Sequence, residues 1–153
     1  MSEQKIRLGI TGSGFMGQTH AEAACQVEEV QAVAVAGGSR APKMAETYNL
    51  KVEPDARSLV RRDDVDAVLI TTPHHIHVAE ALEAIQCGKH LLVEKPITTS
   101  VEDCDRILEA ADGEGVVVAV GYHQRFRGNV SEACKVLRSG ILGPILTVQV
   151  AMP

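Results

Sequence analysis

The sequence predicts an α/β protein in which helices cover both faces of a doubly wound parallel sheet. Short apolar runs alternate along the chain with longer segments whose apolar residues recur at helical spacing. The chain is 45% hydrophobic but has no Trp, two Tyr and two Phe, so Val, Ile, Leu and Ala must build its core. Such a composition favours helices packed on a buried parallel sheet. With 153 residues, the chain is long enough for one domain with a sizeable core.

Apolar runs of strand length recur along the chain. The predicted strands are Lys5–Thr11, Gln31–Ala36, a short segment near Lys51–Val52, Ala67–Thr71, His90–Val93, Val116–Val120 and Ile145–Val150. The predicted helices are Phe15–Val27, Ala41–Tyr48, Ala56–Arg61, a helix from Pro73 to a C-cap at Gly88, a helix from Ser100 through Ala111, and a helix from Val130 to Gly140. Because helices separate successive strands, we expect parallel pairing, right-handed crossovers and the strand order 3-2-1-4-5-6.

The helix that begins at Ser100 carries its own start signal. Ser100 is predicted to be the N-cap, with Asp103 as its capping-box partner. Apolar residues follow at helical spacing and predict which face is buried. The predicted buried face consists of Val101, Cys104, Leu108 and Ala111.

A glycine-rich stretch follows the first predicted strand and opens the first predicted helix. Its sequence, Gly12-Ser13-Gly14-Phe15-Met16-Gly17, matches a Gly-x-Gly-x-x-Gly turn. The first glycine allows a tight turn, the second lets a pyrophosphate approach the backbone, and the third lets the helix lie close to the strand. The helix N-terminus then offers free N–H groups to the phosphates. We therefore expect a dinucleotide site, with a plain structural turn as the alternative. The candidate cofactor-binding residues here are Gly12, Gly14, Phe15, Met16 and Gly17.

The end of the second predicted strand bears on the choice of cofactor. An NAD-binding protein is expected to place a carboxylate about 20 residues beyond the glycines, to hold the ribose 2′-hydroxyl. This chain has Gly37-Gly38-Ser39-Arg40 there instead. Ser39 can donate a hydrogen bond to a 2′-phosphate and Arg40 can pair with it. We therefore expect NADP in preference to NAD. The alternative for Arg40 is a solvated residue in the first turn of a helix.

Polar residues also follow the fourth predicted strand. Thr71 and Thr72 are placed to touch a ribose or a nicotinamide, or to cap the next helix. Three histidines lie in the next five residues, Pro73-His74-His75-Ile76-His77, and suggest a metal site. No Cys, Asp or Glu completes a ligand set nearby, so we expect no metal.

A lysine follows the fifth predicted strand, in the sequence Glu94-Lys95-Pro96. A lysine at the carboxyl end of a strand, in a partly dry cleft, can serve as proton donor or acceptor for an alcohol or a ketone. A Glu-Lys pair on the protein surface is the ordinary alternative.

The composition excludes several classes of protein. The net charge is −5 and there is no basic block, so the chain lacks the footprint of a nucleic-acid-binding protein. No apolar run approaches the ~20 residues of a membrane-spanning helix. The first residues, MSEQKIRLG, lack an apolar signal core, and we expect a cytoplasmic protein. The four cysteines form no C-x-x-C pair, so they are expected to be small buried thiols in a reducing compartment.

Further motifs accompany the glycine turn. They are Thr72-Pro73 followed by His77 and Ala81-Leu82, Gly88-Lys89-His90 leading to Glu94-Lys95-Pro96, Gly121 followed by Arg125-Phe126, and Gly140-x-x-Gly143 before the last predicted strand. With these motifs the chain resembles the N-terminal, Rossmann-type domain of the Gfo/Idh/MocA oxidoreductases, the family of glucose-fructose oxidoreductase and inositol dehydrogenase. The resemblance covers almost the whole chain, and its motifs together are much more specific than the glycines alone.

The resemblance implies an activity and a set of residues. The family transfers hydride between a nicotinamide cofactor, NADP or NAD, and commonly a sugar, a polyol or a related carbonyl compound. By resemblance, Lys95 is the catalytic proton donor or acceptor that hydrogen-bonds the reacting oxygen, and Glu94 borders the nicotinamide ribose. In the family, the proline at the position of Pro96 often follows a cis peptide. Thr72, Pro73 and His77 belong to the cofactor-binding set. Arg125 contacts cofactor or substrate, or alternatively forms a structural salt bridge.

The resemblance also predicts the domain organisation. Residues 1–143 are expected to form the dinucleotide-binding domain, and residues 144–153 a truncated lead-in to a C-terminal substrate domain that is absent. A partner chain or a homo-oligomer would then supply the substrate domain, and an apolar edge near Ile145–Met152 would be exposed. The alternative is a non-catalytic module that binds or senses NADP(H). No GxxxxGK[ST] sequence supports a kinase.

Overall fold

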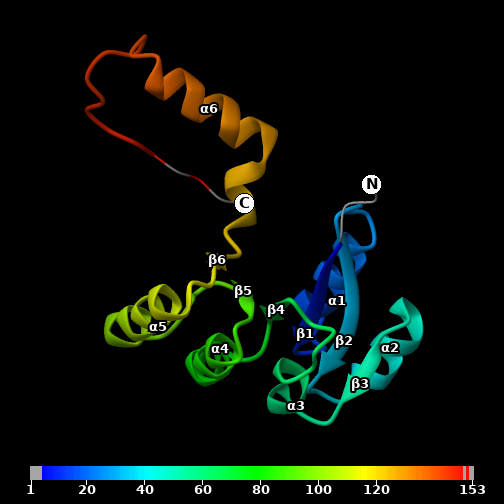
Figure 1. Cartoon of the computed structure of the whole chain (residues 1–153). Helices are drawn as coiled ribbons and strands as arrows, with labels where there is room; N and C mark the ends of the chain where they lie inside the picture. The colour runs from blue at the N-terminus through cyan, green and yellow to red at the C-terminus, as the bar shows by residue number, and fades with distance from the viewer. Residues whose placement is uncertain (1–4, 150, 152–153) are drawn as a thin grey trace. The chain divides into compact units, whose positions relative to one another are not determined.

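The computed structural model describes residues 5–149 and 151. These residues form two compact units, one that extends to Gly121 and one that starts at Tyr122, and each is described by itself. The first unit contains a six-stranded sheet with the strand order β3-β2-β1-β4-β5-β6 (Figure 1). Each pair of neighbouring strands is parallel. The predicted doubly wound order is therefore confirmed.

The helices and strands follow the predicted alternation closely. The strands are β1 (Ile6–Thr11), β2 (Val30–Ala36), β3 (Lys51–Glu53), β4 (Ala67–Ile70), β5 (His90–Val93) and β6 (Val118–Val120). The helices of the first unit are α1 (Phe15–Ala24), α2 (Ala41–Tyr48), α3 (Ala56–Val60), the 3₁₀ turn η1 (His74–Ile76), α4 (His77–Gln86) and α5 (Val101–Glu114). The second unit contains the 3₁₀ turn η2 (His123–Phe126) and α6 (Gly128–Arg138).

The core consists of two apolar layers, one on each face of the sheet. Successive strand residues point to opposite faces, so Val35 packs with α1 and α2, whereas its neighbours Ala34 and Ala36 pack with α3, α4 and α5. In the same way, Leu69 of β4 faces the first layer while the residues on either side of it face the second. Both faces of the sheet are therefore covered by helices, as a buried parallel sheet requires.

The buried face of α5 differs from the prediction. Ser100 does cap the helix, because its Oγ accepts a hydrogen bond from the Asp103 N–H at 3.2 Å. However, Val101 is 73% exposed and Leu108 is 53% exposed, whereas Ile107 is fully buried. Ala111 is buried as predicted and packs with Ile107 against the second apolar layer, so the prediction is wrong for Val101 and Leu108.

The thiols are less buried than the sequence suggested. Cys25 is exposed, because α1 ends at Ala24 rather than continuing to residue 27. The three other cysteines are half-buried, and all four are free. The prediction of buried thiols is therefore wrong for Cys25, and the three other thiols are only partly buried.

The second unit differs from the prediction at its C-terminal segment. Residues 145–149 form no strand, and residue 150 of the predicted strand lies outside the described residues. Among the described residues no neighbouring strand pairs with this segment, and a strand depends on such pairing. Its apolar side chains are exposed, with Leu146 at 92%, as predicted for an apolar edge.

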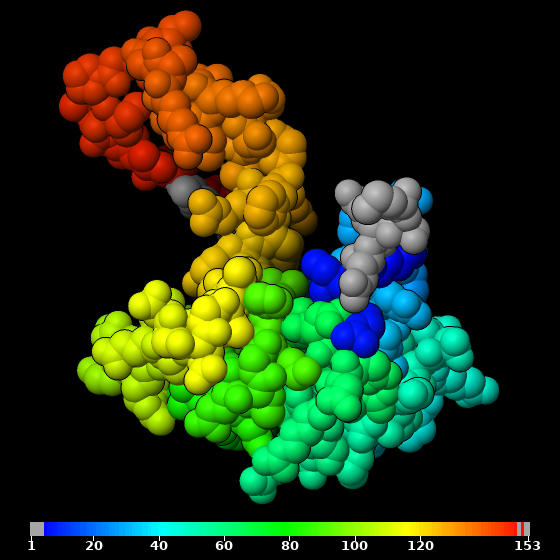
Figure 2. Space-filling model, viewed as in Figure 1, coloured from blue at the N-terminus to red at the C-terminus, as the bar shows by residue number. Residues whose placement is uncertain are grey.

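Helix α6 has no buried residue. Figure 2 gives the surface of the chain in the same colours.

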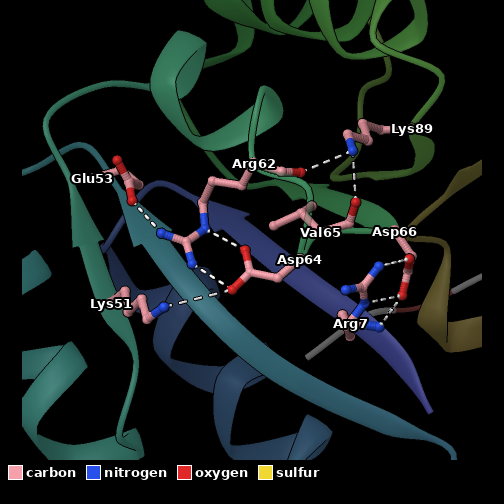
Figure 3. Close-up of polar contacts among 8 residues, drawn as sticks. All are labelled: Arg7, Lys51, Glu53, Arg62, Asp64, Val65, Asp66 and Lys89. Atoms are coloured by element: carbon pink, nitrogen blue, oxygen red, sulfur yellow. Dashed lines mark hydrogen bonds and ion pairs between the residues drawn. The ribbon is translucent and has the colours of Figure 1, made fainter. Parts of the chain in front are cut away.

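An ion pair fastens β1 to the start of β4 at the amino end of the sheet. The Arg7 guanidinium donates from Nε to Asp66 Oδ2 at 2.9 Å and from Nη2 to Oδ1 at 2.6 Å (Figure 3). The Arg7 backbone N–H also donates to Asp66 Oδ2, at 2.8 Å. The hydrogen bonds from the Arg7 side chain are the main cause that lowers the pKa of Asp66 from 3.8 to about 2.

A second polar cluster holds the loop between α3 and β4. Arg62 donates to Asp64 from Nε at 2.8 Å and from Nη2 at 2.6 Å, and its Nη1 donates to Glu53 at the end of β3 (Figure 3). The Lys89 ammonium donates to the carbonyl oxygens of Arg62, at 3.0 Å, and Val65, at 2.7 Å. The loop is thereby connected both to β3 and to the segment that precedes β5.

The Arg7–Asp66 pair predicts a loss of stability in acid. Folding lowers the pKa of Asp66, so its stabilising effect is complete above about pH 4 and is lost as the pH falls toward 2. Since both side chains are about one-third exposed, we expect Asp66→Asn to lower the free energy of unfolding by about 1 kcal/mol at pH 7. Urea unfolding at pH 7 and at about pH 2.5 measures this effect.

The matched control is Asp63→Asn, because Asp63 is an exposed neighbour that makes no ion pair among the described residues. The difference in the free energy of unfolding between Asp66→Asn and the parent should shrink at the lower pH. The free energy of unfolding of Asp63→Asn should match that of the parent at both pH values. A difference of equal size at both pH values would contradict the role of the ionised carboxylate.

Candidate functional site

The candidate site lies at the carboxyl edge of the sheet in the first unit. Thr11 of β1 is paired with Ala36 of β2 and with Ile70 of β4, and Ile70 is paired with Val93 of β5. These four strands therefore end at the same level, and the segments that follow them start side by side (Figure 1). In doubly wound sheets, ligands bind at this edge, near the point where the strand order reverses.

The glycine turn between β1 and α1 is tightly packed at two positions. Gly12 has φ +92°, and a Cβ there would lie 2.7 Å from Thr71 Oγ1 and 2.8 Å from the Thr71 backbone. A Cβ on Gly17 would collide with the Gly12 carbonyl oxygen. The predicted tight turn at Gly12 and the predicted close approach of the helix at Gly17 are both confirmed.

The second glycine of the turn, Gly14, faces open space. A Cβ added to Gly14 would meet no protein atom within 4 Å. Gly14 is the N-cap of α1, yet no side chain caps the helix and no acidic residue lies in its first turn. Within residues 5–149 and 151, no acceptor is bonded to the N–H groups of residues 15–17, and these groups carry the positive end of the helix dipole. Phe15 and Met16 flank the turn, exposed and half-buried respectively. This arrangement fits the pyrophosphate of a dinucleotide.

The segment after β2 lies against the glycine turn. A Cβ on Gly38 would lie 2.5 Å from Ser13 Oγ, so the two loops are in close contact. Ser39 and Arg40 follow and are exposed. A cavity of about 310 Å³ lies beside them, between α1 and α2. Its lining residues are Gln18, Arg40, Lys43, Met44, Thr47 and Tyr48.

The two threonines after β4 use their hydroxyl groups inside the protein. Thr71 Oγ1 lies within donor distance of the Thr11 carbonyl, at 2.8 Å, and of the Gly12 carbonyl, at 3.0 Å. Thr72 Oγ1 donates to Glu80 Oε2 at 2.9 Å. Thr71 is thus part of the support beneath the glycine turn, and neither hydroxyl caps a helix. Pro73 is exposed at the start of the next turn.

His77 begins α4 and is completely buried. Its Nε2 lies 2.8 Å from the Thr72 carbonyl oxygen, and its Nδ1 lies 3.0 Å from the Pro96 carbonyl oxygen. A ring without accessible surface cannot touch a bound nucleotide, so His77 supports the site from behind. His74 and His75 are exposed, and the residues that the structure describes contain no group of three His, Cys, Asp or Glu placed to hold a metal ion.

The turn after β5 carries a buried carboxylate and an exposed lysine. Glu94 is 5% exposed, and its Oε2 accepts a hydrogen bond from the Lys95 N–H at 3.1 Å. Its Oε1 lies 2.7 Å from Nε2 of His20 on α1. Lys95 is exposed rather than held in a partly dry cleft as expected. The Lys95–Pro96 peptide is cis, as the resemblance implied.

The sequence-based prediction missed three residues of this site. His20 contacts Glu94, while Glu80 accepts hydrogen bonds from both Thr72 and Thr11, the latter at 2.7 Å. Burial raises the pKa of Glu80, and the two hydroxyl groups act in the opposite direction. A signal for His20 was present, since it lies three residues after Gly17 and so on the same face of α1. Glu80 and Thr11 are distant in sequence and gave no local signal.

Arg125 lies in η2 of the second unit and is exposed. Its contact with cofactor or substrate stays a prediction. Among the helices of the described residues, none has the length and apolar character needed to cross a bilayer.

The family assignment follows from comparison with known proteins. Residues 6–122 match the family described as "Oxidoreductase family, NAD-binding Rossmann fold". The chain belongs to the Gfo/Idh/MocA oxidoreductase family. The matched residues extend from the first residue of β1 to just beyond β6, so they include the glycine turn and the Glu94-Lys95-Pro96 turn.

The curated relatives of this chain include proteins named as dehydrogenases and one named as a hydratase. Inositol 2-dehydrogenase 3 of Saccharopolyspora erythraea is 34% identical over 142 residues, which are 90% of this chain and 42% of that protein. Inositol 2-dehydrogenase/D-chiro-inositol 3-dehydrogenase of Halalkalibacterium halodurans is 33% identical over 95% of this chain and 44% of its own length. The 2,7-anhydro-N-acetylneuraminate hydratase of Mediterraneibacter gnavus is 31% identical over 92% of this chain and 38% of its own length. The chain thus spans about two fifths of the length of these relatives.

Solved structures share the fold over the same region. The apo scyllo-inositol dehydrogenase from Lactobacillus casei superposes with a TM-score of 0.87 at 25% identity, over 94% of this chain and 44% of that one. A putative NADPH-dependent oxidoreductase from Desulfitobacterium hafniense superposes with a TM-score of 0.86 at 25% identity, over 92% of this chain and 41% of that one.

The packing of the glycine turn predicts very different losses of stability for two similar substitutions. Gly17→Ala should destabilise the protein by about 3 kcal/mol, because its Cβ collides with backbone that cannot move freely. Gly14→Ala should cost about 1 kcal/mol or less, since its Cβ enters open space and only the N-cap preference is lost. Urea unfolding of both variants measures the two values. Equal destabilisation by the two would show that the turn is not packed as described.

Proposed function

We propose that this chain is the nucleotide-binding part of an NAD(P)-dependent oxidoreductase that acts on a sugar, a polyol or a related carbonyl compound. The observation that carries the proposal is the uncapped helix N-terminus with open space at Gly14, at the same edge of the sheet as Lys95. The substrate class is supported by the names of the inositol dehydrogenases among the relatives.

The residues of the chain have distinct roles in this proposal. The backbone N–H groups of the glycine turn and of Phe15 and Met16 bind the pyrophosphate. When bound, a nicotinamide cofactor supplies the hydride acceptor or donor. Lys95 donates a hydrogen bond to the reacting oxygen and holds or returns its proton. Glu94, together with Thr72 and Pro73, borders the nicotinamide ribose. The exposure of Lys95 leaves its ammonium accessible to a substrate.

Three observations support a preference for NADP. No carboxylate follows β2 at the position where it would repel a 2′-phosphate. Ser39 and Arg40 are exposed next to the glycine turn. The adjacent cavity of about 310 Å³ has both Arg40 and Lys43 in its lining. A guanidinium with a phosphate forms strong, charge-assisted hydrogen bonds, and the 2′-hydroxyl of NAD offers no such partner.

Arg40→Gln tests the cofactor preference. The Kd for NADPH should rise about tenfold, because a charge-assisted hydrogen bond to the 2′-phosphate is lost. The Kd for NADH should stay within about twofold. Fluorescence titration of the purified protein with each nucleotide measures both values. Arg57→Gln, on the opposite face of the sheet, is the matched control and should change neither value. Tighter NADH than NADPH binding by the parent would contradict the preference.

Lys95→Met tests the catalytic role. In an assay with NADP and a panel of inositols and other polyols, kcat should fall at least about 100-fold, because the proton donor or acceptor is lost. Nucleotide affinity should remain within about twofold of the parent. Lys51→Met, which removes an exposed lysine on β3, is the control and should leave kcat unchanged.

A parent protein that binds NADPH tightly but turns over no polyol, sugar or carbonyl compound would favour the non-catalytic nucleotide-binding module. Turnover that survives in Lys95→Met would remove the lysine from the mechanism.

A further inference from the structure

The turn that carries Lys95 contacts a histidine on each side, the half-buried His20 and the buried His77. On its N-terminal side, the Glu94 carboxylate meets His20 Nε2 at 2.7 Å. On its C-terminal side, the Pro96 carbonyl oxygen meets His77 Nδ1 at 3.0 Å. The two histidines come from α1 and α4, which pack on opposite faces of the sheet. The backbone on either side of Lys95 is therefore connected to a different layer of the protein.

The contact with His20 extends to the Lys95 backbone. Glu94 Oε1 faces the His20 ring, and Glu94 Oε2 accepts the hydrogen bond of the Lys95 N–H at 3.1 Å. Glu94 is nearly buried, and a buried carboxylate requires partners for both oxygens. His20 thus fixes the carboxylate that in turn holds the Lys95 amide, although the Lys95 side chain itself is exposed.

Both ring nitrogens of His77 lie within hydrogen-bond distance of backbone carbonyl oxygens, Nε2 at 2.8 Å from that of Thr72 and Nδ1 at 3.0 Å from that of Pro96. His77 has no accessible surface, so water cannot replace either partner.

We propose that His20 is a positioning residue for Lys95, acting through the Glu94 carboxylate. The role of Lys95 rests on the proposed function, whereas the His20 contact can be tested without cofactor or substrate. Fixing the backbone on both sides limits the positions that the Lys95 ammonium can reach, which is the contribution of orientation to catalysis.

The His20 contact is tested by hydrogen exchange of the Lys95 amide. His20→Leu removes the partner of Glu94 and should speed this exchange about fivefold. His20→Gln retains an N–H donor and should restore exchange to within about twofold of the parent. The amides of Leu69 and Ile70, in the core strand β4, report whether the fold is intact and should not change. Unchanged Lys95 exchange in His20→Leu, or faster exchange in both variants, overturns the positioning role.

Turnover separates this proposal from the proposed function. In the polyol assay, His20→Leu should lower kcat about tenfold while the KM for the nucleotide stays unchanged, and His20→Gln should recover most of the loss. If Lys95→Met proves fully active, the proposed function fails, yet the exchange result still decides the His20 contact. If turnover depends on Lys95 but not on His20, the positioning role is overturned.

Discussion

The close contact between Gly12, Gly17 and Thr71 sets the geometry of the carboxyl edge of the sheet. The first turn of α1 lies so near β1 and the end of β4 that no Cβ fits at either glycine. The Thr71 hydroxyl fills the remaining space and reaches the carbonyl oxygens of the turn. Because α1 is held in this way, His20, which lies one turn beyond Gly17, can reach Glu94 just after β5.

Charged groups are distributed unequally between the two ends of the sheet. At the amino end, Arg7 is matched to Asp66 (Figure 3). At the carboxyl edge, Arg40 and Lys95 are exposed and form no ion pair within the described part of the chain. Paired charges satisfy each other, whereas cations left exposed beside a helix N-terminus attract an anion. The carboxyl edge is therefore the end of the sheet suited to a phosphorylated ligand.

Much of the fold could be predicted from the sequence because its signals are local. Short apolar runs, glycine at helix ends and the Ser100 cap each act within a few residues, and they gave the strand order and most element bounds. The buried face of α5 was predicted only in part. Burial depends on where the helix packs against its neighbours, and the spacing of apolar residues within the helix does not determine that. The segment over 145–149 has the residues of a strand, but it lacks a pairing neighbour among the described residues. The site was predictable to the same extent: Lys95 and the glycines stand in recognisable motifs, whereas His20 contacts Glu94 across 74 positions of sequence.

The lengths of the strands decrease from the middle of the sheet to its margins. β1 and β2 have six and seven residues, whereas β3 and β6, at the two margins, have three each. A marginal strand presents unpaired N–H and C=O groups that can join another sheet, and very short marginal strands offer few of them. The tapering therefore protects the folded domain from edge-to-edge self-association.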